Sequence, residues 1–270
     1  MSDKPLSIRP AAVAGLFYSD DPAQLHADIS HYLSNASQHS KLPAITKPKA
    51  IIVPHAGYIY SGPVAASAYA LLKPLAQHIR HVILLGPSHR VAFRGIATPD
   101  ADFFSTPLGQ VAINRQLCQR AQQFDFVQPL AAAHAQEHSL EVQLPFLQTL
   151  LAGFDLTPLV VGDCPASDVA QVLDALWGEN DTLIVISSDL SHYHNYEVAR
   201  RLDAHTTQAI EQLLPENISY DDACGRAPLN GLLTLAKQKQ LTIDTLDLRN
   251  SGDTAGSKDR VVGYGAYAVH

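Results

Sequence analysis

Cysteine is scarce in this sequence of 270 residues, and its pattern excludes two kinds of scaffold. The three cysteines, Cys118, Cys164 and Cys224, are odd in number and lack the paired spacing of a zinc finger. A cytosolic setting would keep such thiols reduced, so we do not expect a disulfide framework. The sequence also lacks a Walker-type phosphate loop and a G-x-S-x-G motif, so serine-based hydrolysis has no support.

Long apolar runs and blocks of basic residues are also absent. Residues 1–21 carry mixed charge without the apolar core of a signal peptide or membrane span, which predicts a cytoplasmic protein with no membrane partner. The formal net charge is −7, and no Lys/Arg block stands out. This charge argues against a nucleic-acid partner, which would require a basic surface. We expect a small molecule or a peptide as the partner instead.

Strand and helix signals alternate along the rest of the chain, as is typical of parallel βαβ units. The first expected strand begins at residue 50. The others lie at 82–85, 95–98, 156–161, 183–187, 242–248 and 261–270. The expected helices lie at 61–72, 113–122, 139–151, 166–177, 196–214 and 229–239. The apolar fraction is 46% and no composition break marks a linker, which predicts one α/β domain over residues 1–270.

Three of these strands run directly into a loop that carries histidine. The segments are AIIVPHAGY (50–58), HVILLGPSH (81–89) and LIVISSDLSH (183–192). In open α/β sheets such strand ends converge on one edge, where ligands bind. We therefore expect His55, His89, Asp189 and His192 to share a site. Imidazoles with a carboxylate suit iron, zinc, copper or manganese, so the recurrence indicates a metal.

The residues alone leave individual roles open. A single histidine in such a loop is often only a surface or capping residue. Asp189 and His192 lie three apart and can face the same way in a turn. Asp189 is suited to orient a histidine, to act as a base or to ligate directly, and equally to cap the following helix. These alternatives cannot be separated by spacing.

The segment HAQEHSLE, residues 134–141, supports two readings. It contains H-x-x-E-H, the inverted zinc-protease motif, which would make His134 and His138 zinc ligands of a hydrolase and Glu137 its base. The second reading, which we favour, pairs His138 with Glu141 as an acid/base or supporting pair on one helical face toward the strand ends. Otherwise Glu141 is a solvated surface residue.

Cys224 lies in DDACGRAP, just before an expected helix. A thiolate at a helix N-terminus is favoured by the helix dipole, which makes Cys224 a plausible soft ligand or redox group. The commoner fate of a free cysteine is to be a small buried residue, and spacing alone favours that fate.

Taken together, the motifs of this chain resemble those of the Memo protein family, which includes the members called AmmeMemoRadiSam system protein B. The resemblance covers nearly the whole chain in the right order. It rests on RPAAVAGLFY, PHAGYIYSGPVAASAY, ILLGPSH, EHSLEVQLPFLQ, ISSDLSHYHNY, ACGRAP and VVGYGAYAVH.

The resemblance implies a fold and a set of site residues. The fold would be an α/β sandwich around a mostly parallel central sheet, similar to class III non-heme iron extradiol dioxygenases, with the site at one edge. The metal ligands would be His55, His89 and Cys224. Asp189 and His192 would line the same pocket, and His134 would have no family role.

The implied function is metal-dependent redox chemistry of undefined substrate. The dioxygenases use a carboxylate as third iron ligand, whereas the matching position here is a cysteine. Because a thiolate favours softer ions, we expect iron or copper, with zinc as an option, and do not assume ring cleavage. The alternatives are a peptide- or protein-binding module that uses the same pocket, and the zinc hydrolase described above. The family name also implies a radical-SAM partner protein.

Overall fold

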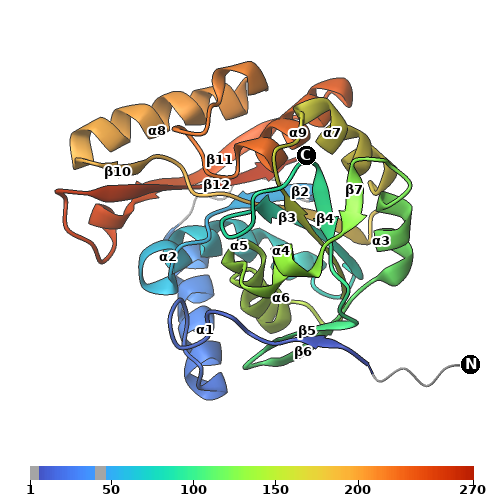
Figure 1. Cartoon of the computed structure of the whole chain (residues 1–270). Coiled ribbons are helices and arrows are strands. Elements are labelled where there is room, and N and C mark those ends of the chain that lie inside the picture. Colours follow the sequence, from blue (N-terminus) through green and yellow to red (C-terminus); the bar gives the residue numbers. More distant parts are fainter. Residues whose placement is uncertain (1–5, 40–46) are drawn as a thin grey trace, which may run out of the picture.

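The computed structural model describes residues 6–39 and 47–270 (Figure 1). Within these residues, nine strands form the central sheet. In spatial order they are β10 (His192–His194), β12 (Val261–Val269), β2 (Ala50–Val53), β9 (Thr182–Ser187), β3 (His81–Pro87), β8 (Asp155–Val161), β4 (Ile96–Thr98) and β7 (Val127–Pro129), and β11 (Ile243–Asn250) also pairs with β12. A separate three-stranded sheet contains β1 (Ile8–Arg9), β5 (Phe103–Thr106) and β6 (Gly109–Ala112).

The central sheet is mixed, so the prediction of a mostly parallel sheet was wrong. The middle strands β2, β9, β3 and β8 are parallel to one another. On either side of them, β12 runs antiparallel to β2, and β4 runs antiparallel to β8. The connections explain the difference, because a parallel pair requires a crossover of about a dozen residues or more. Residues 251–260 link β11 directly to β12, which makes this pair an antiparallel hairpin.

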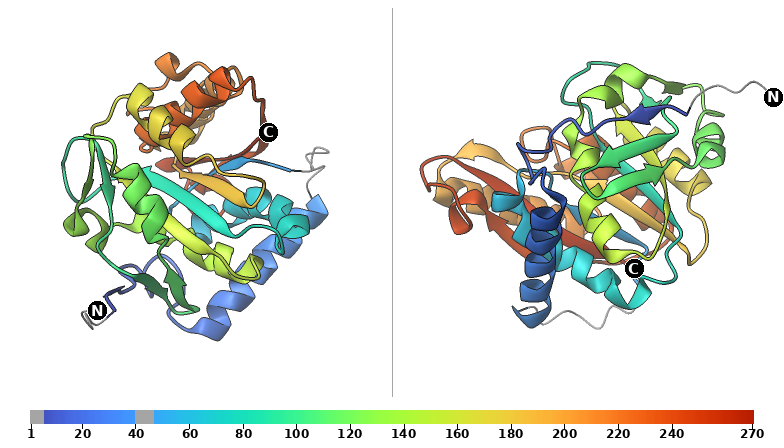
Figure 2. Two further views of the ribbon diagram at one scale, coloured as in Figure 1. Left: turned by 90° about the vertical axis from the view of Figure 1, so that its right-hand side faces the viewer. Right: turned by 90° about the horizontal axis from the view of Figure 1, so that it is seen from below.

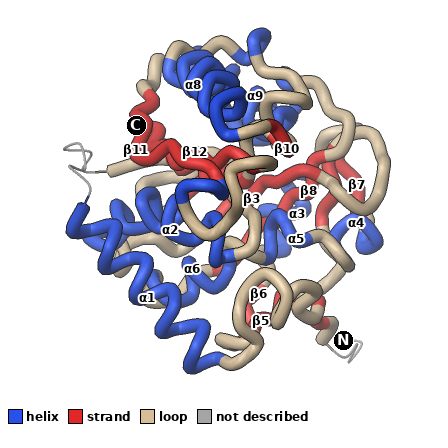
Figure 3. Tube along the Cα trace, turned by 90° about the vertical axis from the view of Figure 1, so that its left-hand side faces the viewer, coloured by secondary structure: helices blue, strands red, loops and turns tan. Residues whose placement is uncertain are grey.

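Helices cover both faces of the sheet, as Figures 2 and 3 show. One face carries α1 (Pro22–His39), α2 (Tyr58–Tyr69) and α6 (Leu144–Leu150), and the other carries α7 (Ala166–Ala175), α8 (Tyr196–Glu211) and α9 (Arg226–Gln238). Alternate side chains of β3 point to opposite faces. Val82 and Leu84 therefore join the core beneath α1 and α2, whereas Ile83 and Leu85 join the core beneath α7 and α9. None of the described helices is long and apolar enough to cross a membrane.

Short helices lie between β6 and β8 along the chain. They are α3 (Arg115–Ala121), α4 (Ala131–Ala135) and α5 (His138–Glu141). The single helix predicted over residues 139–151 is in fact two helices, α5 and α6. Pro145 lies in the first turn of α6, a position that suits proline but cannot continue a preceding helix. The break leaves His138 at the first residue of α5.

The close approach of α5 to β3 depends on Gly86. A Cβ atom at Gly86 would lie 2.7 Å from Ser139 Oγ and 2.9 Å from the Leu140 side chain. We expect Gly86→Ala to push α5 away from β3 and to lower the free energy of unfolding by about 1–3 kcal/mol. Urea denaturation measures this change, and an unchanged midpoint would contradict the packing role of Gly86.

Candidate metal centre

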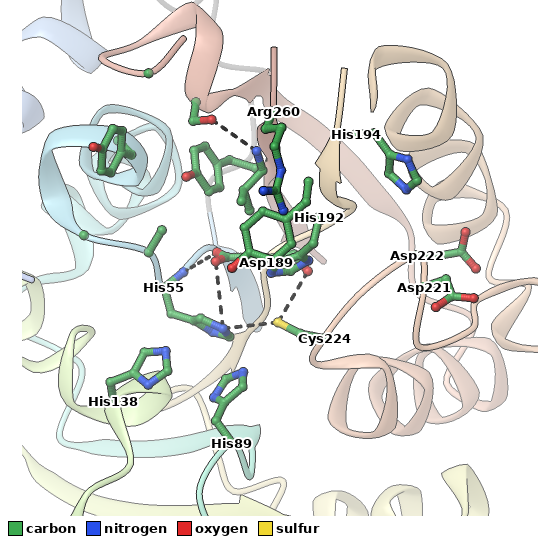
Figure 4. Close-up of a pocket in the computed structure, with 18 of the residues that line it drawn as sticks. His55, His89, His138, Asp189, His192, His194, Asp221, Asp222, Cys224 and Arg260 are labelled. Carbon is green, nitrogen blue, oxygen red and sulfur yellow. Dashed lines mark hydrogen bonds and ion pairs between the residues drawn. The ribbon is translucent and has the colours of Figure 1, made fainter. Parts of the chain in front are cut away.

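The parallel strands of the central sheet deliver three polar residues to one place. His55 follows β2 by two residues, Asp189 follows β9 by two, and His89 follows β3 by two. Since β2 pairs with β9 and β9 with β3 in parallel register, these loops lie next to one another. They line one open cleft of about 1350 Å³, together with His138, His192 and Cys224 (Figure 4). The structure thus brings together six of the seven predicted site residues. The seventh, Glu141, does not line the cleft.

Three histidines form the centre of this cleft. His55, His89 and His138 each offer a ligand atom, and these atoms lie within 4.8 Å of one another. The rings of His89 and His138 stack with centroids 4.6 Å apart, and His55 meets both edge-on. His138, predicted as an acid/base group, therefore sits where a metal ligand would sit.

Cys224 contacts the same cluster from α9's side. Its Sγ lies 3.2 Å from His55 Nε2 and 3.8 Å from the carbonyl oxygen of Asp189. Burial raises the pKa of the Cys224 thiol, and the nearby Asp189 carboxylate raises it further. Cys224 is not one of the three residues whose ligand atoms all lie within 4.8 Å, so His138 competes with it as third ligand.

Glu137 orients His89. Its Oε1 lies 2.9 Å from His89 Nδ1, and its Oε2 accepts the His89 backbone N–H at 2.6 Å. Burial by itself raises the pKa of Glu137, but the hydrogen bonds from His89 and Ser139 outweigh burial and hold the pKa at about 2. An ionised carboxylate on Nδ1 keeps the proton there and leaves His89 Nε2 free to bind an ion, as in carboxylate–histidine–metal triads.

His55 and His138 are held in their neutral forms. Burial lowers the pKa of His55 well below its usual range, and the neighbouring His89 lowers it further. Burial, with His55 and His89, lowers the pKa of His138 to about 4. Neutral imidazoles keep the lone pair that binds a metal ion. His138 Nδ1 is buried and makes no hydrogen bond within the described residues, and it lies 3.5 Å from Glu137 Oε1.

Asp189 and His192 flank the three histidines. Asp189 Oδ1 accepts the backbone N–H of His55 at 2.7 Å, and Oδ2 lies 4.0 Å from His55 Nε2. Burial raises the pKa of Asp189, although the His55 hydrogen bond opposes this. His192 begins β10 and lines the same cleft. Both residues line the same cleft as the three histidines, and their supporting role stays a prediction.

Glu141 lies outside the cleft, so its predicted role as an acid/base partner of His138 is not supported. Its carboxylate is fully buried in an ion pair with Arg9. The same carboxylate accepts hydrogen bonds from the Tyr18 hydroxyl at 2.6 Å and from the backbone N–H groups of Ala12 and Val13. Because these partners all lie in residues 9–18, Glu141 anchors the N-terminal segment.

The zinc-hydrolase hypothesis also fails on geometry. His134 and His138 lie on separate short helices, α4 and α5, and do not share a helical face. His134 Nε2 contacts the carbonyl oxygen of Ala97 at 3.0 Å, and the ring packs against Phe104. His134 does not line the cleft that holds His138. Of the proposed triad, Glu137 and His138 belong to the cluster and His134 does not.

Reasoning from the sequence missed the residues that hold the histidine rings. Glu137 was weighed only as a hydrolase base, and Ser187, which lies 2.9 Å from His55 Nδ1, was not considered. The available signal was position, because Glu137 is the first residue of the site motif EHS and Ser187 is the first residue of the site motif SSD.

Removal of the Glu137 charge tests its orienting role. In Glu137→Gln an amide N–H₂ replaces one of the oxygens that accept from His89, so the ring loses its fixed orientation. We expect metal affinity to fall by about 10- to 100-fold. Competition with a chromophoric chelator measures the affinity, with Glu216→Gln, an exposed glutamate away from the cleft, as control. Equal affinities for the two variants would contradict the role.

Comparisons with known proteins agree with this geometry. Residues 9–268 match the family described as Memo-like protein. A MEMO1 family protein of Aquifex aeolicus is 36% identical over 273 residues, which cover 96% of this chain and 98% of the relative. A MEMO1 family protein of Metallosphaera sedula is 34% identical over 276 residues, covering 95% and 97%.

The crystal structure of the uncharacterized protein JW3007 from Escherichia coli K12 has a similar fold. Its TM-score is 0.53 at 12% sequence identity, and the match covers 81% of this chain and 99% of that one. At such identity the likeness concerns the fold alone, and similarity to extradiol dioxygenases stays a prediction. The family match and the full-length relatives confirm the predicted resemblance, and the chain belongs to the Memo family.

Proposed function

We propose that this protein binds one iron or copper ion and is a redox-type protein. The observation that carries the proposal is the placement of three imidazole ligand atoms within 4.8 Å of one another, with a cysteine thiol 3.2 Å from one of the rings. Nitrogen and sulfur donors favour iron, copper and zinc over magnesium and calcium. His55 and His89 are the shared ligands, and Cys224 and His138 compete for the third position.

The surrounding residues suit a reactive centre. When bound, a redox metal supplies electron transfer and polarises a coordinated substrate. Asp189 and His192 line the same cleft, and both are placed to hold or move a proton near His55. A dioxygenase-like oxidoreductase activity is the enzymatic form of this proposal, with its substrate undefined.

A cytoplasmic location belongs to the same proposal. All three cysteines are free, with Cys118 and Cys164 buried. Ligation by Cys224 requires a reduced thiol, and reducing compartments keep such thiols free.

A second candidate is a non-enzymatic module that binds a peptide in the cleft. The supporting observation is the exposure of aromatic side chains that line it: Tyr60 is 38%, Tyr193 63% and Tyr220 54% exposed. Exposed aromatic rings are typical anchors for protein partners. This candidate predicts that a bound peptide is retained equally by metal-loaded and metal-free protein.

Metal analysis of anaerobically purified protein tests the first proposal. We expect one iron or copper ion per chain, removable by a chelator and restored by adding back the ion to the metal-free protein. Recovery of metal-free protein that also fails to bind Fe(II), Cu(I) or Cu(II) at micromolar concentration would reject it and favour the binding module.

A further inference from the structure

We propose that Ser187 and Gln143 are positioning residues that fix the tautomer of His55, so that its Nε2 atom faces the cleft without a proton. The role of this arrangement in metal binding rests on the function proposed above, whereas the tautomer of His55 is assigned from hydrogen bonds alone. It follows from counting donors and acceptors around a single hydroxyl group at the end of β9.

The Ser187 hydroxyl has three polar neighbours. Its Oγ lies 2.6 Å from the backbone carbonyl oxygen of Ser139, 2.9 Å from Gln143 Nε2 and 2.9 Å from His55 Nδ1. A serine hydroxyl has one proton to donate and two lone pairs with which to accept. Because a carbonyl can only accept, the serine proton goes to Ser139. The other two neighbours must therefore both donate to Ser187.

The orientation of the Gln143 amide is independently determined. Its other contact through Nε2 is the carbonyl oxygen of Pro54 at 2.9 Å, which requires a donor. Its Oε1 lies 2.9 Å from the Tyr69 hydroxyl, which donates to it. Gln143 and Tyr69 are both buried, so water does not offer alternative partners. A flipped amide would set oxygen against oxygen at Pro54.

These constraints assign the proton of His55. The Ser187 hydroxyl donates its proton to the Ser139 carbonyl, and one of its lone pairs accepts from Gln143. The remaining lone pair can only accept a hydrogen bond, so His55 Nδ1 carries the hydrogen. A neutral imidazole has one N–H, and His55 is buried, where the uncharged ring is favoured. Nε2 is thus an unprotonated nitrogen, and it faces Cys224 Sγ at 3.2 Å. The two histidines are therefore oriented by different groups. The Glu137 carboxylate holds the His89 ring, and the uncharged Ser187 hydroxyl holds the His55 ring.

The wild-type protein tests the assignment directly. Long-range ¹H–¹⁵N correlation NMR of metal-free, ¹⁵N-labelled protein distinguishes the protonated from the unprotonated nitrogen of each neutral histidine, and His55→Gln identifies the His55 signals by their loss. We expect the Nδ1–H form for His55 at neutral pH. Observation of the Nε2–H form as the main species would overturn the proposal, whatever the metal affinity.

Two serine variants separate positioning from general packing. In Ser187→Ala the Nδ1–H group loses its hydroxyl acceptor, so we expect the Nε2–H form to become populated and metal affinity to fall by about 10- to 100-fold. The matched control is Ser188→Ala, since Ser188 is equally buried and its Oγ also makes two hydrogen bonds, to the Asp189 carbonyl and from the Gly225 N–H. The control should keep the Nδ1–H form of His55.

The outcomes distinguish this inference from the proposed function. An Nδ1–H form in wild-type protein that shifts in Ser187→Ala supports the positioning role even if no metal binds, in which case only the metal proposal fails. An unchanged tautomer in a folded Ser187→Ala variant would overturn the positioning role even if the metal binds.

Discussion

Replacement of His89 by alanine is expected to lower metal affinity by about 100-fold or more while leaving the fold intact. Four-ligand structural zinc sites bind with about 10–16 kcal/mol, so one ligand contributes on the order of 3 kcal/mol, which corresponds to about 100-fold. The His89 side chain is 28% exposed and follows the end of β3, so its removal opens no large cavity. Metal affinity and circular dichroism, measured together, separate loss of the site from loss of the fold.

His134→Ala is the matched control for this prediction. His134 belongs to the same histidine-rich stretch as His138 but lies outside the cleft, against Ala97 and Phe104. We expect His134→Ala to keep the metal affinity of the wild type. Retention of metal by His89→Ala together with loss in His134→Ala would reverse the assignment and restore the zinc-hydrolase hypothesis.

The identity of the third ligand is settled by a second comparison of variants. Cys224→Ser and His138→Ala each remove one candidate, and the larger loss of affinity identifies the ligand. Loss of a thiolate-to-metal charge-transfer band in Cys224→Ser, with copper as the probe, would show direct ligation by the cysteine. Equal small losses would place both residues outside direct contact with the ion.

Replacement of Glu141 by glutamine is expected to destabilise the fold by about 3–5 kcal/mol, since it leaves the Arg9 guanidinium buried without its charged partner. Arg9 also donates to the backbone carbonyls of His134 and Glu137, so it ties both α5 and the segment just before it to the N-terminal part of the chain. In a domain of this size such a loss lowers the melting temperature by about 10 °C. Metal affinity, measured well below the transition, should stay close to that of the wild type.

The matched control for this prediction is Glu197→Gln. Glu197 pairs with Arg200 at the exposed surface of α8, where ion pairs contribute little, so we expect a change of at most about 1 kcal/mol. Differential scanning calorimetry compares the two variants. A Glu141→Gln variant as stable as wild type, or one that loses metal without losing stability, would contradict the anchoring role and revive the acid/base role.

The strand-end histidines could be predicted because they depend on local patterns. Short β-branched runs predict buried strands, and the loops that follow neighbouring parallel strands meet at one edge of the sheet. His55, Asp189 and His89 therefore came together as expected, and Cys224 joined them through the family resemblance. The predictions for His55, His89 and Asp189 used only the order and type of the elements.

The rest of the site depends on contacts between distant residues. Glu141 was assigned to the cleft because helical spacing places it on the same side as His138, but Arg9, 132 positions away, binds its carboxylate instead. The position of His138 depends on the Glu137 cap at the start of α5 and on the approach of α5 to Gly86. The antiparallel pairing of β11 with β12 contributes to the mixed sheet. Its direction depends on the short link between the two strands, and strand composition alone does not predict it.

An anomalous-scattering map of crystals grown anaerobically with iron or copper tests the central claim most directly, with data collected on both sides of the metal absorption edge. We predict a single strong peak between His55 and His89, in contact with either Cys224 or His138. A cleft without a peak, or a peak at His134 or elsewhere on the surface, would contradict the assignment of this cleft as the metal centre.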